Sequence, residues 1–240
     1  MKFIDWWNRL LSYVLSTSSK KEKLIRQMGS SDNAIAREAA EQLRDKGWLE
    51  DGSLRSVHLQ DANLERANLA NADLSFVNLQ RANLAGANLQ GAILIGADLS
   101  FANLDNANLH DVDLRNSILQ DASLYEINLS NSNLKYAFLP KVDMGKAVLE
   151  NANLQKIDLE GANLTGANLV HADFRGAILQ EAVLFNSNLH GANLMECNLK
   201  NSKVALNQLA KAKSLEGATM PDGMVYNPET FKKWLEGQNA

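Results

Sequence analysis

The sequence predicts an all-β solenoid whose coils have four short, straight sides, and three observations lead to this fold class. A leucine-type residue recurs at every fifth position from Leu54 to Val204, which gives 31 consecutive quintets. A small residue, usually alanine, stands two positions before it, and asparagine or aspartate commonly stands one position before it. A period of five matches neither the 3.6-residue repeat of a helix nor the alternation of a strand.

A square coil accounts for this period. If each quintet forms one side, three residues run extended and two turn the corner, so the leucine and the alanine both point inward. Four sides make a coil of 20 residues, and successive coils stack about 4.8 Å apart through backbone hydrogen bonds along the axis. The 31 sides make nearly eight coils. Only a small side chain can stand beside each inward leucine.

The undiluted pattern appears in Ala62-Asn63-Leu64, Ala82-Asn83-Leu84 and Ala162-Asn163-Leu164. In these runs the chain resembles the pentapeptide-repeat proteins, whose pattern is A(D/N)Lxx. The resemblance covers about two-thirds of the chain. It implies a right-handed quadrilateral β-helix, and it implies a rod that binds other proteins, although different members of the family bind different partners.

The repeat divides the chain into three expected parts. Residues 1–51 form an N-terminal helical segment and cap, residues 52–206 form the β-helix, and residues 207–240 form a C-terminal cap with a short helix. Caps are expected because the open ends of a β-helix expose unpaired backbone groups and apolar leucines, which favour end-to-end polymerisation.

Two helices are expected before the repeat. The first is amphipathic and carries apolar residues at helical spacing, namely Phe3, Trp6, Trp7, Leu10, Leu11, Val14 and Leu15. A polar stretch follows at residues 16–19. The second helix begins with Ser31 or Asp32 as its N-cap and ends at Gly47. Its apolar face carries Ala36, Ala39, Ala40 and Leu43. Residues 24–51 are the expected cover of the rod.

The five-residue register ends after Val204. Residues 205–212 are expected to form a short helical insertion. Further on, Asn227-Pro228-Glu229 combines an N-cap, a proline at the first helical position and an acid in the first turn. This combination predicts a last helix whose apolar face carries Phe231, Trp234 and Leu235.

Composition narrows the function. The net charge of −4 gives no basis for direct nucleic-acid binding. The single cysteine, Cys197, falls at an inward small-residue position, where a core role is expected. No apolar run reaches the roughly 18 residues that a membrane span needs. Asp5 and Arg9 interrupt the apolar core that a secretory signal would need, so a cytoplasmic location is expected.

No enzymatic site is expected, and neither is a cofactor or a metal. His110 and His190 fall on one side but four coils apart, and His171 and His190 have only Asp111 and Asp173 as further candidate ligands. The chain has no glycine-rich phosphate loop and no serine motif between a strand and a helix. A convex rod also lacks the cleft that catalysis requires.

Outward apolar residues provide the first candidate for a binding site. Folding the sequence by 20 stacks Ile118 on Phe138, places Ile178 two coils beyond and Tyr136 at the adjoining corner, with Ile93 and Ile95 at the same edge lower down. Arg115, Lys135 and Lys141 would rim this cluster. A partner surface or a dimer contact would explain the clustering. Scattered surface residues, or contacts with the terminal helices, are the alternative.

Two further functions remain open at this point. Some pentapeptide-repeat proteins imitate DNA and bind type II topoisomerases such as gyrase. Here one side carries Asp61, Asp98, Asp121, Asp158, Glu160 and Glu181 against Arg81, Lys141 and Lys200. The repeat has 16 acids and 11 bases, whereas full mimicry over a rod of about 37 Å needs on the order of 20 negative charges.

The third possibility is a peripheral membrane adaptor. The aromatic N-terminal helix with Phe3, Trp6, Trp7, Leu10 and Leu11 precedes three lysines and could lie in a membrane interface. Taken together, the sequence favours a non-enzymatic scaffold that binds another protein through an outer side of the β-helix. The identity of that protein stays open, as does a homodimer through a terminal helix or the outer apolar cluster.

Overall fold

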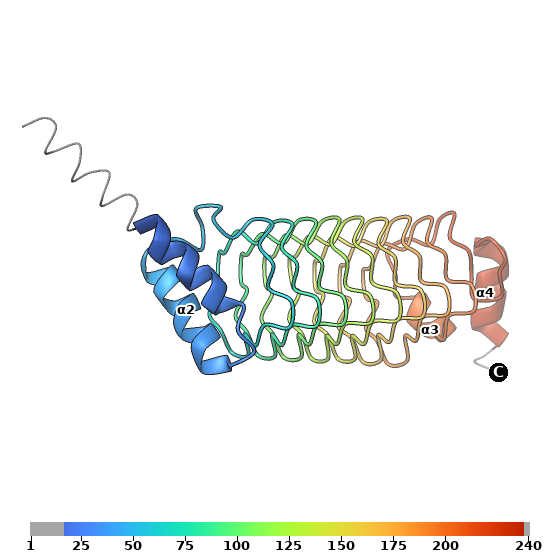
Figure 1. Ribbon diagram of the computed structural model, residues 1–240. Coiled ribbons are helices and arrows are strands. Elements are labelled where there is room, and N and C mark those ends of the chain that lie inside the picture. Colours follow the sequence, from blue (N-terminus) through green and yellow to red (C-terminus); the bar gives the residue numbers. More distant parts are fainter. Residues whose placement is uncertain (1–16, 238–240) are drawn as a thin grey trace, which may run out of the picture.

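The computed structural model describes residues 17–237 and shows a rod of stacked square coils with helices at both ends (Figure 1). Before the coils lie a helical segment at residues 17–28 and helix α2 (Asn33–Asp45). The last coil contains the short helix α3 (Leu206–Leu209), and helix α4 (Pro228–Gly237) follows the coils. Within residues 17–237, none of the helices has the length and apolar character that crossing a bilayer requires.

Backbone hydrogen bonds join each side of a coil to the coils before and after it. Leu64 donates its N–H to the carbonyl of Asn83 at 2.7 Å, and Asn83 donates its own N–H to the carbonyl of Ala62 at 2.9 Å. The residue before each leucine therefore bridges its counterpart 20 positions away in a parallel sense. Because each side contributes one bridged residue, the walls consist of bridges and not of long strands. The predicted right-handed quadrilateral β-helix is confirmed.

The bridges form four ladders, which define the four sides of the rod. Side 1 carries His58, Asn78, Asp98, Ile118, Phe138, Asp158, Ile178 and Asn198. Side 2 carries Asn63, Asn83, Asn103, Ser123, Asp143, Asn163, Val183 and Lys203. Side 3 carries Asn68, Asn88, Asn108, Asn128, Val148, Asn168 and Asn188. Side 4 carries Asp73, Ile93, Asp113, Asn133, Asn153, Asp173 and Asn193.

Each corner between these sides is a two-residue turn whose second residue has a left-handed backbone. After Leu64, Arg66 has φ 56°, and Ala67 donates its N–H to the carbonyl of Leu64 at 2.9 Å, as in a type II turn. Residues other than glycine rarely adopt this conformation, which costs roughly 1 kcal/mol. Hydrogen bonds between coils, such as that from Arg66 N–H to the carbonyl of Ala85 at 2.9 Å, offset the cost.

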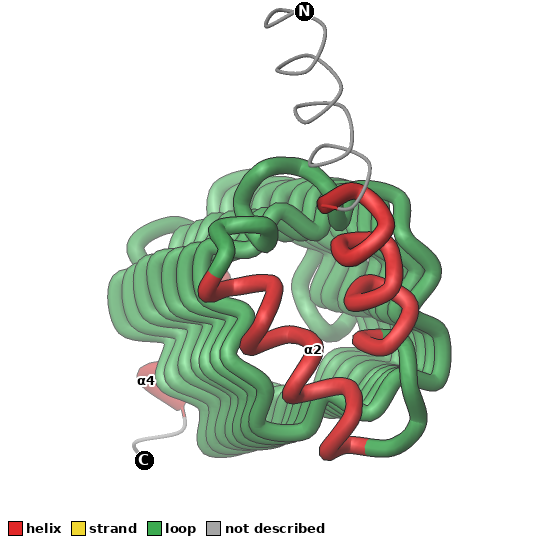
Figure 2. Tube along the Cα trace, turned by 60° about the vertical axis from the view of Figure 1, so that its left-hand side comes forward, coloured by secondary structure: helices red, strands yellow, loops and turns green. Residues whose placement is uncertain are grey.

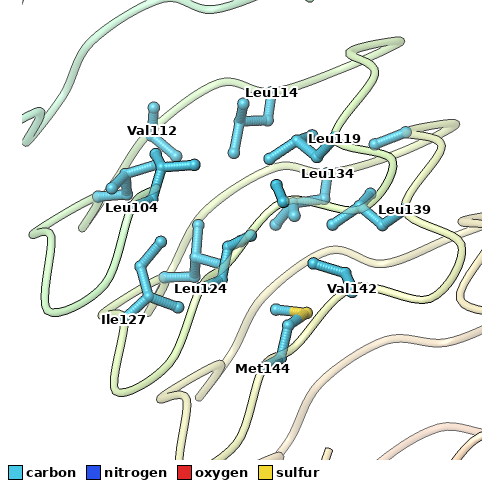
Figure 3. Packing of buried hydrophobic residues seen from close by; sticks show 14 of the residues in the cluster. Leu104, Val112, Leu114, Leu119, Leu124, Ile127, Leu134, Leu139, Val142 and Met144 are labelled. Atoms are coloured by element: carbon cyan, nitrogen blue, oxygen red, sulfur yellow. The ribbon is translucent and has the colours of Figure 1, made fainter. Parts of the chain in front are cut away.

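Leucines and small residues fill a continuous core along the axis, which Figure 3 shows for the middle coils. Leu104 and Leu124 are fully buried, as are Met144 and Phe174 at leucine positions. Cys197 occupies a small-residue position, and its Sγ lies 3.1 Å from the carbonyl of Phe174. Burial raises the pKa of the Cys197 thiol to about 12. The environment is that of a core residue and not of a reactive thiol.

The polar residue before each leucine stabilises the wall from outside. On side 3, the Nδ2 groups of Asn88 and Asn108 each donate to the Oδ1 of the asparagine one coil earlier, at 3.2 Å. Val148 interrupts this amide ladder. The same type of oxygen also accepts the N–H two residues later, as Asn78 does from Gln80 at 3.0 Å. This turn chemistry explains why asparagine and aspartate are frequent at the position.

Helix α2 lies across the N-terminal end of the rod (Figure 2). The Asp32 side chain accepts hydrogen bonds from the N–H groups of Ala34 and Ile35, which confirms Asp32 as the N-cap. The helix buries Ala36, Ala39, Ala40 and Leu43, the face that the sequence predicts. Gly47 follows with φ 68°, the left-handed conformation that commonly ends a helix.

The cover also supplies acceptors to the first coil. Asn63 donates its N–H to the carbonyl of Ser30, and Asp73 donates its N–H to the carbonyl of Leu49, both at 2.8 Å. In every later coil, the equivalent N–H groups bond to the coil before. Residues 30–49 therefore take the place of a preceding coil on sides 2 and 4, which removes part of the open edge.

At the other end, helix α3 replaces one side of the last coil. Leu209 is buried in the core. The Gln208 side chain donates from Nε2 to the carbonyls of Leu184 at 2.8 Å and Ser187 at 2.9 Å. Side 3 thus ends in hydrogen bonds from a side chain. On side 1 the chain then reverses direction, and Val225 pairs with Thr219 in an antiparallel bridge.

One sequence prediction about the N-terminal cap is wrong. A polar break was expected at residues 16–19, but residues 17–28 are helical. Ser18 donates from Oγ to Glu22 Oε1 at 3.2 Å, along one face of this helix. Leu24 and Met28 are buried in the same core as the rod. Packing of these two side chains outweighs the low helix propensity of the serines.

Asp73 is the buried carboxylate of the first coil, with 4% of its surface exposed. Arg55 donates from Nε to its Oδ2 at 2.7 Å, and Ser75 donates from Oγ to its Oδ1 at 2.7 Å. Burial alone would raise the pKa of Asp73, but the hydrogen bonds from Ser75 and Arg55 hold it below its ordinary value.

The inward leucines should dominate stability. We expect Leu104→Ala to lower the free energy of unfolding by about 2–5 kcal/mol, because it leaves a cavity in a closely packed layer. Ile178→Ala removes a similar side chain from the outer surface and should cost about 1 kcal/mol or less. Urea denaturation followed by circular dichroism measures both. Equal losses in the two variants would contradict the inward assignment.

Asp73 should make stability depend on pH. Asp73→Asn should cost about 1–2 kcal/mol at pH 7, because charge-assisted hydrogen bonds are lost. The folded pKa lies below the unfolded value of about 3.9, so the contribution is complete above that value and is lost as pH falls through the folded pKa. In denaturation experiments, the difference between wild type and variant should stay constant from pH 7 to 5 and shrink towards pH 3. A difference that grows on acidification would refute this role.

Candidate interaction surface

Side 1 is the side on which large apolar residues face outward in adjacent coils. Ile118 and Phe138 bridge each other directly, and they are 41% and 40% exposed. Most ladder positions elsewhere hold asparagine or aspartate, whose side chains bond to the turns. Ile118 and Phe138 make no such bond and stand outside the core. Their exposure costs solubility without supporting the rod, which is typical of a contact surface.

Tyr136 extends this apolar surface at the corner before Phe138. The residue is 48% exposed. The Nζ of Lys135 lies 5.1 Å from the centroid of its ring, and the Nζ of Lys156 lies 5.7 Å from it. Ammonium groups at such distances attract the face of an aromatic ring. The two lysines therefore hold the ring in place at the surface.

The other predicted apolar residues are more widely distributed. Ile178 is on side 1, 40% exposed, with Asp158 bridging both it and Phe138. Ile95 is half-buried at the turn between sides 4 and 1. Ile93 lies on side 4, where it bridges Asp73 and Asp113. Ile93 and Ile95 therefore flank the corner between sides 4 and 1, with Ile93 facing outward from side 4.

Sequence reasoning missed three exposed phenylalanines. Phe101 is 57% exposed at the corner after Asp98, between sides 1 and 2. Phe76 is 62% exposed at a corner before side 1, and Phe185 is 51% exposed at the turn between sides 2 and 3. All three occupy corner positions, which face outward in every quintet, so the five-residue register itself places them at the surface.

The two edges of side 1 differ in charge. We call the turn residues between sides 4 and 1 the first edge, and those between sides 1 and 2 the second edge. The first edge carries Arg115, Lys135, Lys156 and Arg175. The second edge carries Asp61, Arg81, Asp121, Lys141, Glu160, Glu181 and Lys200. The first edge is therefore basic over the middle of the rod, and the second edge is mixed with an excess of acids.

Several of these charges have partners on the same chain. Arg115 contacts Asp113, and Arg81 contacts Asp61, each at 2.7 Å. The hydrogen bond from Arg81 lowers the pKa of Asp61. Asp98 is partly buried, which would raise its pKa, but hydrogen bonds from Ser100 and Gln80 lower it overall. Part of the predicted acidic side is thus already neutralised or solvated by the protein.

The histidines form no metal centre within the described part of the chain. No group of three or more histidine, cysteine, aspartate and glutamate residues is arranged to hold an ion there. His171 and His190 stack edge to face, with ring centroids 6.0 Å apart. His110 instead contacts Asp111 and Ser130. The predicted aromatic helix with Phe3, Trp6, Trp7, Leu10 and Leu11 lies outside the described residues.

The fold and these surfaces define a solenoid repeat protein. The family described as pentapeptide repeats matches the chain in eight copies, over residues 53–86, 82–121, 143–180 and 162–201. The chain therefore belongs to the pentapeptide-repeat family, whose members generally serve as structural or interaction proteins. No relative was found among curated proteins.

Three solved structures illustrate the range of the similarity. QnrB1, a plasmid-mediated fluoroquinolone resistance protein, is 16% identical over 78% of this chain and 90% of its own, with a TM-score of 0.43. HetL from the cyanobacterium Nostoc, involved in the regulation of heterocyst differentiation, is 27% identical over 79% and 98%, with a TM-score of 0.24. Another pentapeptide-repeat protein from Nostoc is 36% identical over 43% and 79%, with a TM-score of 0.36.

The corner at Gly96 should be sensitive to substitution because of Phe76. Gly96 has φ 65°, and an added Cβ would lie 2.6 Å from the Phe76 ring. Gly161 has φ 67°, but its added Cβ would lie 3.5 Å from Lys141 Cγ. Both alanine variants carry the backbone cost of about 1 kcal/mol. We expect Gly96→Ala to lower the melting temperature further than Gly161→Ala, and Phe76→Ala to remove the difference. Identical melting of the two single variants would show that the Phe76 ring yields freely.

Proposed function

We propose that this protein is a non-enzymatic, cytoplasmic scaffold that binds a partner protein through side 1. The observation that carries the proposal is the contiguous surface of Ile118, Phe138 and Tyr136 on the outside of a rod whose core does not use them. Aromatic residues at the centre of a contact surface contribute most to binding between proteins. The charged edges on either side would form the polar rim of such an interface.

The geometry supports binding in preference to catalysis. The outer walls are regular and convex, and their polar side chains mainly bond to the turns of their own or adjacent coils. One polar hollow is open and lies beside His171, Asp173 and Arg175, and Arg175 already contacts Asp173 at 2.7 Å. An active site needs an activated group in an enclosed pocket. The family assignment favours an interaction role as well.

The alternative of a DNA mimic has less support from the charges on side 1. Two of the acids, Asp61 and Asp98, have their oxygens occupied by Arg81 or by Ser100 and Gln80. A DNA-like surface needs regularly spaced charges that are free for a partner. A gyrase supercoiling assay separates the two functions, because inhibition at micromolar protein would favour mimicry over the proposed scaffold.

The apolar surface should be required for association. We expect Phe138→Asp combined with Tyr136→Ala to abolish capture of the partner in a pull-down analysed by mass spectrometry, because the change places a charge in the centre of the contact. Phe185→Asp changes a phenylalanine that is more exposed, at a corner away from side 1, and should leave capture intact. Circular dichroism and melting should match wild type for both. If the double variant captures the same proteins as wild type, side 1 is not the binding surface.

A further inference from the structure

The two edges of side 1 are complementary to each other layer by layer. In the layer of Ile118, Arg115 stands on the first edge and Asp121 on the second. In the layer of Asp158, these places are taken by Lys156 and Glu160. The pattern continues in the layer of Ile178 with Arg175 and Glu181, and it reverses in the layer of Asn198 with Glu196 and Lys200. These four layers each carry opposite charges on their two edges.

The other two layers of this surface do not pair opposite charges. In the layer of Asp98, apolar Ile95 on the first edge stands across from apolar Phe101 on the second. In the layer of Phe138, Lys135 and the Tyr136 ring on the first edge stand across from Lys141 on the second, so both edges of this layer are cationic. The Tyr136 ring attracts ammonium groups, as it does those of Lys135 and Lys156, and this attraction offsets part of the repulsion between Lys135 and Lys141.

We propose that the occupant of side 1 is a second copy of this chain, with the two rods side by side and pointing in the same direction. The inference rests on the proposed function, since it names the partner of the same surface. A two-fold axis parallel to the rods sets the first edge of one copy against the second edge of the other in the same layer. Every complementary pair within a layer then becomes a contact between copies.

In this arrangement the ladder residues of side 1 lie along the two-fold axis, so each one faces the same residue of the second copy. Ile118, Phe138 and Ile178 each contact the same residue of the second copy, and this contact covers the exposed apolar surface. Asp98 and Asp158 also meet their counterparts, and Lys135 faces Lys141 in the layer of Phe138; these are the unfavourable contacts. Asp98 is already stabilised by Ser100 and Gln80, and Asp158 accepts the N–H of Glu160 at 3.0 Å.

The antiparallel arrangement has no such complementarity. A two-fold axis across the rods would set the first edge of one copy against the first edge of the other. Arg115, Lys135 and Lys156 would then face one another, and like charges brought together at an interface disfavour binding. The distribution of charge therefore selects parallel rods.

The size of the surface sets the expected strength. Six layers spaced about 4.8 Å apart, each roughly 13 Å wide, give a flat area of about 400 Å² per copy. Stable complexes commonly bury about 800 Å² per partner. The dimer should therefore be weak and should form with increasing protein concentration. The edge contacts are exposed, so added salt should weaken it further.

Charge reversal on one edge at a time tests the arrangement. The first variant, Arg115→Asp with Lys156→Asp, makes both edges acidic at these layers, and the second, Asp121→Arg with Glu160→Lys, makes both basic. Each variant alone should dimerise about tenfold more weakly than wild type in sedimentation velocity over a range of concentrations, because four contacts become repulsive. An equimolar mixture of the two should regain dimers, since every acidic edge then meets a basic one.

Disulfide trapping reports the direction of the rods. Ile118→Cys and Ile178→Cys should each form a disulfide between copies under mild oxidation, because both positions meet their own image only when the rods are parallel. In an antiparallel dimer at most one ladder position can do so. Phe185→Cys, at an exposed corner away from side 1, provides the background rate. Trapping at one of the two positions only would overturn the parallel arrangement.

The remaining outcomes separate this inference from the proposed function. If wild type stays monomeric up to several hundred micromolar, or if the equimolar mixture of the two variants does not regain dimers, a second copy does not occupy side 1. The proposed function then still stands if Phe138→Asp with Tyr136→Ala loses a captured protein of another kind. Self-association that neither charge reversal nor the Phe138 variant changes would overturn the inference. Circular dichroism of each variant confirms that folding is intact.

Discussion

The narrow interior of the coil is the constraint on which the structure depends. Each layer holds four large apolar side chains with four mostly small ones beside them, and close packing limits their total volume. Val112, Ile127, Val142 and Ile157 are buried at small-residue positions, and Phe174 fills a leucine position beside the small-residue position of Cys197 in the next coil. Two of every five residues are committed to this interior. The other three face outward or form the corner, so only these residues can provide a binding surface.

The outer positions are restricted in turn by the corners. The asparagine or aspartate before each leucine binds the turn that follows. Replacing it with an apolar residue, as at Phe138, removes that bond. Pro140 stands two residues later, where the N–H would otherwise need an acceptor, and proline has no N–H to satisfy. The apolar surface on side 1 is therefore built into the wall without leaving an unsatisfied donor at this corner.

The repeating part of the structure could be predicted from the sequence because its signal is periodic and local. The inward leucines, the amide ladder and the N-cap at Asp32 all follow from residue type and spacing. The helix at residues 17–28 could not, because its stability comes from packing of Leu24 and Met28 against a core formed elsewhere in the chain. The charge relation between the two edges of side 1 could not be predicted either, because it depends on the fold placing residues such as Arg115 and Asp121 on opposite edges of one side.

The last coil shows how the rod accommodates a change in length. Asn193 bridges Ser214, and Asn198 bridges Thr219, so this coil contains 21 residues and not 20. The detour through α3 absorbs the extra residue, and Thr219 still aligns with side 1. Without such a detour, gaining one quintet would rotate every later residue by a quarter turn, whereas gaining four quintets would lengthen the rod and leave its faces aligned. Duplication in this repeat can therefore redirect a binding surface without changing any residue in it.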